Sequence, residues 1–385
     1  MLAVTVLGFG GYALLLPVVP LWVADAGEFA AGATTGVLML TTIATQLAVP
    51  WLVARVGYRA ALGAGLVLLG APTPLLALSA ALGPVLALSA VRGVGFGLLT
   101  VVGSALVAEL VAPAEHGRAA ARYGIAIGLP QLVLLPAGVA TVQAVGFTGV
   151  FVAAGVAPLL GALAVVALRL PTPGAPHTVA ADPDTAGSGT GPGGPRSAAV
   201  APLAAMLTCS VAQGGLITFL PLAVPGGLWV AAALLVTAAG SLAGRSLAGR
   251  LVDRHGMSGR LLLPGVLLAA LGMGTEIAGL TVGPLVVLGA AVVGIGFGLV
   301  QNDALTALFA ASGPRRYGQA SAAWNIAYDA GTGAGAVGLG AVAEPFGFRA
   351  AFGLSALLLL VAAPVTRRRR RPRDDDRAAP ACRSS

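Results

Sequence analysis

The sequence of 385 residues has little of what a soluble protein needs at its surface. Only 9% of its residues are charged, against ~25% in an ordinary soluble domain. Aromatic residues make up only 5%, so the 57% hydrophobic content comes mainly from alanine, leucine and valine. A soluble chain of this length could bury a large core, but its surface would need far more charge. We therefore expect lipid to be the solvent for most of the chain.

Lysine is absent, and cysteine is scarce. All 22 basic residues are arginine, and most of them lie between apolar runs or in the tail. This distribution argues against a nucleic-acid partner despite the net charge of +8. Cys209 and Cys382 lie far apart in the sequence, so they predict neither a disulfide nor a metal site. Nothing in the sequence indicates a cofactor.

What the sequence has instead is a series of long apolar runs. A helix needs ~20 apolar residues to cross a bilayer. Breaking the chain at charges and at glycine and proline clusters gives twelve such runs, near 2–24, 32–54, 60–80, 83–108, 119–142, 147–168, 200–222, 227–248, 260–280, 284–310, 319–342 and 347–365. The first run has no basic residues before it, which favours a transmembrane helix over a signal peptide. The sequence predicts an all-α membrane protein of twelve transmembrane helices.

The connections between these runs alternate in charge. Arginine is concentrated after the second, fourth, eighth and tenth runs, in the central linker and in the tail. Connections after odd-numbered runs contain almost none, Arg349 being the exception. Because positively charged connections stay in the cytoplasm, we expect a multi-pass protein of the cell (inner) membrane with both termini cytoplasmic.

The chain divides into two halves. Residues 171–199 are rich in Pro, Gly, Thr and Ser without periodicity, so they cannot bury enough apolar surface to fold. We expect them to form a disordered cytoplasmic linker between one six-helix half, residues 1–170, and another, residues 200–366. Residues 367–385 form a basic cytoplasmic tail, and the run Arg367–Arg371 is expected to bind anionic membrane lipids.

The two halves repeat one another at a nearly constant offset. The segment Gly93–Leu98 (GVGFGL) matches Gly294–Leu299 (GIGFGL) at an offset of 201 residues. Gly146 and Phe147 match Gly347 and Phe348 at the same offset. Six helices per half give both halves the same orientation, which is the parallel repeat of transporters that bind substrate between their halves.

The connection between the eighth and ninth runs carries a family motif. Residues Gly249 to Gly256, with the sequence GRLVDRHG, resemble the loop signature of the major facilitator superfamily (MFS). The first-half copy, residues 50–57, is degenerate, with Pro50 and Ala54 where the family has Gly and Asp. The resemblance covers the chain except its linker and tail, and it implies the MFS fold of two six-helix halves.

Two further segments resemble the same family. Arg92 with Gly95 and Gly97 is similar to the arginine motif of MFS helix 4. Residues 324–333 resemble helix 11 of bacterial drug and sugar efflux members. The antiporter signature expected in helix 5 is only approximated here, for example by Gly-Leu-Pro at 128–130.

Ionisable groups inside a bilayer cost at least ~2.5–3.5 kcal/mol at the helix centre, so each invites a functional interpretation. The resemblance implies that Arg92 assists proton transfer; otherwise it anchors helices through backbone carbonyls. Asp329, deep in the eleventh run, could load and release a proton, or bond an amide such as Asn325. Asp303 lies closer to the cytoplasmic end of its run, which favours a structural or gate role. Glu276 is expected at the membrane interface.

Neutral polar residues complete the candidate proton and substrate site. Gln46, Gln131 and Gln213 lie in the second, fifth and seventh runs. They could line a substrate cavity, or they could bond between packed helices, at ~0.6 kcal/mol for each bond.

A candidate gating loop consists of Gly249, Asp253, Arg254 and Gly256. A carboxylate at Asp253 could cap a helix N-terminus and attract its positive dipole end. The resemblance implies that Asp253 is a latch that holds the cytoplasmic side shut.

Together these features predict a proton-coupled efflux transporter of small lipophilic or amphipathic compounds, working by alternating access as a monomer. Its partners would be the substrate, protons and membrane lipids. Proton-coupled uptake of a small solute is the alternative, although uptake of organic anions would favour more basic groups in the cavity. A membrane-embedded enzyme is disfavoured because His116, His177 and His255 all lie in expected cytoplasmic segments. A non-transporting sensor is also compatible with the sequence.

Overall fold

The computed structural model describes residues 1–109, 116–168, 195–225, 227–312 and 316–367. Throughout these residues the secondary structure is helical and contains no strand, so the all-α prediction is confirmed. Most of the expected linker, residues 171–194, and nearly all of the expected tail, residues 368–385, lie outside the described residues.

The first group of helices follows the predicted apolar runs. Its elements are α1 (Leu2–Leu15), α2 (Val18–Trp22), η1 (Ala24–Ala26), α3 (Glu28–Gly70), η2 (Thr73–Leu78), α4 (Leu82–Glu109) and α5 (His116–Ala167). The run expected as one helix at 2–24 is interrupted at Leu16 and Pro17. Proline explains the interruption, because it has no N–H to donate to the preceding turn.

The second group contains α6 (Pro195–Ala223), α7 (Gly227–His255), α8 (Leu262–Gly279), α9 (Gly283–Ser312) and α10 (Tyr317–Thr366). The start of α6 at Pro195 means that residues 195–199, expected in the linker, are helical. Proline suits the first position of a helix, where its missing N–H would have no partner anyway.

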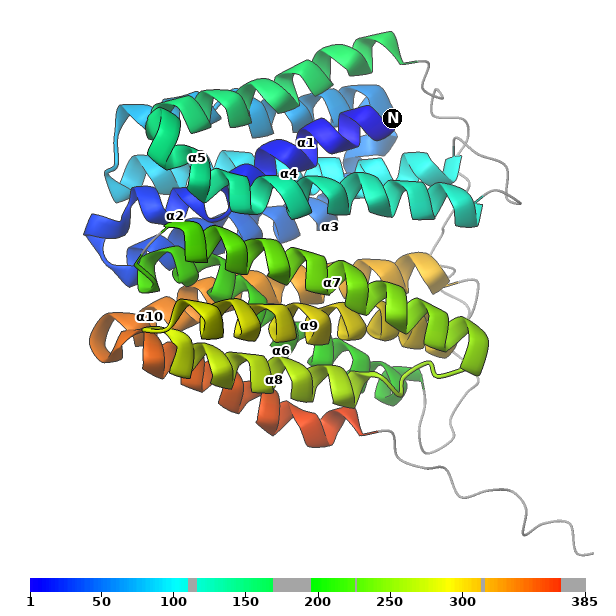
Figure 1. Ribbon diagram of the computed structural model, residues 1–385. Coiled ribbons are helices and arrows are strands. Elements are labelled where there is room, and N and C mark those ends of the chain that lie inside the picture. Colours follow the sequence, from blue (N-terminus) through cyan, green and yellow to red (C-terminus); the bar gives the residue numbers. More distant parts are fainter. Residues whose placement is uncertain (110–115, 169–194, 226, 313–315, 368–385) are drawn as a thin grey trace, which may run out of the picture.

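Nine helices among the described residues are long and apolar enough to cross a membrane, rather than the twelve separate helices expected. Three of them, α3, α5 and α10, have 43, 52 and 50 residues. At ~1.5 Å per residue each is about twice as long as the hydrocarbon core is thick. Each is broken at one glycine, Gly57, Gly146 or Gly347, with φ of 79°, 72° and 78°. Only glycine adopts this conformation freely, and α5 and α10 visibly fold back on themselves (Figure 1).

The helices gather in two groups side by side, α1 to α5 and α6 to α10, and the start of α1 and the end of α10 point toward the same end of the bundle (Figure 1). One cluster of buried apolar side chains runs through both groups. Large apolar side chains also cover the outside, among them Leu47, Leu163, Val166 and Leu228. An apolar core beneath an apolar surface suits lipid as solvent, so the chain is a multi-pass membrane protein.

The two groups meet closely where α3 begins and the first part of α10 ends. A Cβ added at Gly340 of α10 would lie 2.7 Å from the carbonyl oxygen of Glu28 on α3. Beside this contact, the backbone N–H of Phe29 donates to Oε2 of Glu344 at 2.9 Å. The carboxylate of one group therefore caps the helix N-terminus of the other, where the helix dipole favours negative charge.

Candidate functional site

A buried hydrogen bond joins the two groups of helices. Gln46 on α3 donates from Nε2 to Oδ2 of Asp329 on α10 at 2.8 Å, and the two side chains are 8% and 3% exposed. Nε2 of Gln46 also lies 3.3 Å from Oγ1 of Thr100 on α4. Asn325, the amide partner considered from the sequence, donates instead to the carbonyl oxygen of Ser321 one turn earlier. The amide that binds Asp329 therefore comes from the opposite group of helices.

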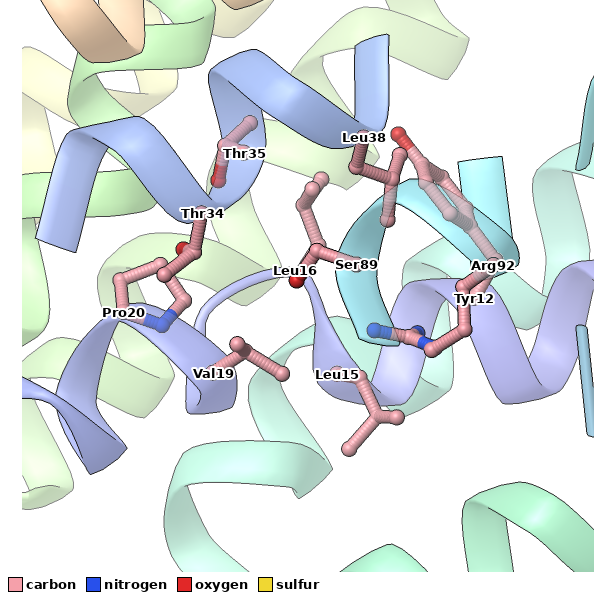
Figure 2. A pocket seen from close by; sticks show the side chains of 10 residues that line it. All are labelled: Tyr12, Leu15, Leu16, Val19, Pro20, Thr34, Thr35, Leu38, Ser89 and Arg92. Atoms are coloured by element: carbon pink, nitrogen blue, oxygen red, sulfur yellow. The ribbon is translucent and has the colours of Figure 1, made fainter. Parts of the chain in front are cut away.

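A small pocket lies between α1, α2, α3 and α4. Arg92 is 2% exposed, and its Nε has no hydrogen-bond partner among the described residues. The buried hydroxyls of Ser89 and Tyr12 also lack partners there. Figure 2 shows these three side chains around the pocket with apolar neighbours such as Leu15 and Leu16. Its free volume of about 10 Å³ has room for about one water molecule.

Tyr12 connects the pocket with Asp329. It is close enough to both Arg92 and Asp329 to interact with them electrostatically, and it interacts likewise with Tyr328. Tyr328 in turn interacts with Arg245 on α7. Arg245 was not among the residues expected from the sequence, although a charge inside an apolar helix was the signal that could have found it. Tyr12 and Tyr328 thus relate Asp329 to the two arginines, neither of which bonds it directly.

The expected gating loop is mostly helical. Because α7 continues to His255, Gly249, Asp253 and Arg254 lie in its last turns rather than in a loop. Gly256 follows with φ of 59°. Its N–H bonds the carbonyl oxygen of Val252, which is how a glycine in the left-handed conformation ends a helix.

Asp303, rather than Asp253, binds backbone N–H groups beside the start of α8. Within the described residues Asp253 is exposed and forms no hydrogen bond or ion pair. Asp303 on α9 is fully buried and accepts hydrogen bonds from the N–H groups of Gly259 and Leu261, each at 2.7 Å, just before α8 begins. Bonds to a charged acceptor are roughly twice as strong as neutral ones. Asp303 therefore positions the connection between α7 and α8.

The other candidate side chains form no hydrogen bond with Asp329 among the described residues. Gln131 on α5 is half-buried, and Gln213 on α6 is buried with its Oε1 unpartnered among the described residues. Glu276, expected at the membrane interface, is fully buried on α8, and neither carboxyl oxygen has a described partner. A Cβ at Gly289 of α9 would lie 3.1 Å from its Cγ, so the glycine lets α9 cover this residue. The described residues contain no cluster of His, Cys, Asp and Glu that could hold a metal.

Comparison with known proteins places this arrangement in a family. The family model of the Major Facilitator Superfamily matches residues 1–336 and 227–383. A bacterial homologue of the human lysosomal transporter Spinster, inward-facing and occupied, has a TM-score of 0.71 at 14% identity over 95% of this chain and 94% of that one. A POT family transporter in complex with 5-aminolevulinic acid has a TM-score of 0.76 at 15% identity over 94% of each chain.

A structure of the peptide transporter POT has a TM-score of 0.77 at 17% identity, and the match covers 95% of this chain and 92% of that one. At such identities the likeness shows the fold. Comparison with curated proteins gave no significant match. The family model covers the chain almost from end to end, which indicates a transporter and not an enzyme: the chain belongs to the Major Facilitator Superfamily.

Proposed function

We propose that the protein is a proton-coupled secondary transporter that works by alternating access. Its two moving bodies are residues 1–170 and 200–366. Each of α3, α5 and α10 crosses the membrane twice, turning at its positive-φ glycine, so that nine helices make twelve crossings. Both termini then lie in the cytoplasm, in agreement with the arginine pattern of the connections.

The bond between Gln46 and Asp329 is the observation that carries this proposal. It links the two bodies, and its acceptor is the group whose charge changes with protonation. A hydrogen bond to an ionised carboxylate is roughly twice as strong as one to a neutral group. Loading a proton on Asp329 therefore weakens the link between the bodies, and releasing the proton restores it.

The pocket at Arg92 is the proposed start of the substrate cavity. Its walls are mainly apolar, which supports small lipophilic or amphipathic substrates. Since it has room for about one water molecule, the described conformation is closed around it, and substrate entry requires the helices to part. The α7–α8 connection held by Asp303 is the proposed cytoplasmic gate.

Efflux by antiport against protons, as a monomer in the cell (inner) membrane, is the preferred direction, following the resemblance of residues 324–333 to efflux members. Uptake by proton symport uses the same geometry and is the alternative. Arg92 and the half-buried Arg245 are basic groups inside apolar helices, and they make this alternative stronger for anionic solutes than the sequence suggested.

Reconstituted vesicles test the proposal. The full chain is placed in liposomes, a pH gradient is imposed, and a panel of compounds is screened for flux with and without a protonophore. We expect flux that follows the gradient and collapses with the protonophore; movement toward the acidic side indicates antiport, and movement away from it indicates symport. Flux that ignores the protonophore contradicts proton coupling.

A further inference from the structure

We propose that the substrate carries an anionic oxygen group, such as a carboxylate, which binds Arg92 in the pocket formed with Ser89 and Tyr12. The inference rests on the proposed transport function and gives its substrate a chemical class. It narrows the expected lipophilic or amphipathic compounds to those with an acidic head and an apolar body.

The balance of charge at the site is the first argument. Arg92 is 2% exposed inside the apolar helix α4 and forms no ion pair among the described residues. The carboxylate of Asp329 is bonded to Gln46 instead. Burying a cation without a counter-ion is costly in a bilayer. Arg92 therefore favours an anionic group as its partner.

The unused hydrogen-bonding capacity of the pocket is the second argument. Nε of Arg92 and the hydroxyls of Ser89 and Tyr12 are buried without a described partner, and all three residues line one pocket (Figure 2). Such groups are normally satisfied in proteins, so Nε of Arg92 and the hydroxyl of Ser89 favour a ligand that accepts hydrogen bonds. Ser89 precedes Arg92 by three residues on α4, which places both on the same face of the helix.

The shape and chemistry of these donors select the ligand. A guanidinium presents a planar fork of donors that matches the two oxygens of a carboxylate. The hydroxyl of Ser89, one turn earlier on α4, can donate to the same oxygens. The remaining walls, including Leu15, Leu16 and Leu38, are apolar and suit an apolar body next to the acidic head. A cationic compound would be repelled there, and a neutral one would leave the guanidinium without a counter-ion.

A binding measurement on the full chain in lipid nanodiscs tests the inference without any gradient. The probes are matched sets of compounds that share an apolar frame and differ only in the head: a carboxylate, its primary amide and the corresponding amine. Their effect on the unfolding temperature gives an apparent Kd. We expect carboxylates to stabilise the protein and the matched amides and amines to have little effect.

Variants identify the residue responsible. Arg92→Gln should weaken carboxylate binding at least about tenfold, as expected for the loss of a charge-assisted bidentate contact. Arg92→Lys keeps the charge but not the planar fork of donors. Its affinity for carboxylates should lie between those of the wild type and Arg92→Gln. Arg349→Gln removes the same charge from an exposed position on α10 and should bind like the wild type. Ser89→Ala is a smaller change and should weaken carboxylate binding measurably. It replaces Arg92→Gln as the test variant if Arg92→Gln does not fold.

The outcomes separate this inference from the proposed function. The site is supported if carboxylates stabilise the wild type and this effect is lost in Arg92→Gln. Ser89→Ala gives the same readout if Arg92→Gln does not fold. This result supports the site even if flux proves independent of the pH gradient. The inference is overturned if no carboxylate stabilises the protein, if amides or amines bind as well, or if Arg92→Lys and Ser89→Ala bind carboxylates like the wild type. If proton-driven flux is confined to neutral or cationic compounds, proton coupling is supported and the anionic substrate class is contradicted.

Discussion

Four acidic or basic side chains are fully or almost fully buried in the described part of the chain, and their surroundings assign them different roles. Asp303 is held by two backbone N–H groups, and Asp329 by one amide. Glu276 has no described partner, and neither does Nε of Arg92. The partner of Asp329 comes from the other group of helices, so its bond changes when the groups separate. The two N–H groups that bind Asp303 belong to the same group of helices as Asp303 itself.

A substitution at Asp303 tests its positioning role. Asp303→Ala leaves the N–H groups of Gly259 and Leu261 without their acceptor at a buried site, and each unsatisfied donor costs ~1–3 kcal/mol. We expect the variant to unfold at clearly lower temperature or denaturant concentration than the wild type in detergent. Asp253→Ala, an exposed carboxylate on α7, serves as the matched control and should leave stability unchanged. Equal stability of the two variants would show that Asp303 does not hold the connection.

At the scale of helices, the sequence predicted most of the fold from apolar runs alone. The sequence predicted that the eighth helix ends near residue 248, whereas α7 continues to His255. The polar residues Asp253, Arg254 and His255 had suggested a loop. A helix can continue through polar residues once it leaves the bilayer, where water satisfies their side chains. The sequence repeat predicted that Gly146 and Gly347 are equivalent. Both turn the chain with a similar positive φ, 72° and 78°.

The contact between α3 and α10 is tested with two neighbouring glycines. A Cβ at Gly340 would press on the carbonyl oxygen of Glu28, whereas a Cβ at Gly338 meets nothing within 4 Å. Gly340→Ala should therefore keep the two helices apart at this end and slow transport several-fold, and Gly338→Ala should not. Cysteine crosslinking across the contact, combined with flux in vesicles, gives the readout. Identical crosslinking in both variants would mean that the contact does not require glycine.

The cap at the start of α3 can be tested independently. Removing the carboxylate with Glu344→Ala takes away the acceptor for Phe29 N–H, and loss of such a cap costs ~0.5–2 kcal/mol. We expect the closed arrangement of α3 and α10 to become less populated, so that a cysteine in place of Met39, a buried α3 residue whose Cβ faces Gly333 of α10, reacts faster with a water-soluble maleimide. Glu344→Gln keeps an oxygen acceptor and should show a smaller increase. Unchanged reactivity in Glu344→Ala would exclude a role in closure.

At the scale of the whole molecule, the sequence could foresee two similar halves but not how they meet. Gln46 and Asp329 are 283 positions apart, and no local pattern pairs them. Periodicity and composition report on single helices, and the repeat relates equivalent positions rather than contacts across the halves. The neutral partner of Asp329 and the unpartnered Nε of Arg92 emerge only when the helices are packed together.

The central claim is that the proton on Asp329 couples the two halves to transport. Its most direct test follows proton movement with a pH dye while a substrate crosses the membrane of reconstituted vesicles. Asp329→Asn keeps the shape of the side chain and an oxygen to accept from Gln46, but it cannot ionise. We predict that this variant still exchanges substrate between the two sides while the accompanying proton movement disappears. Proton movement at the wild-type ratio to substrate in Asp329→Asn would contradict the account.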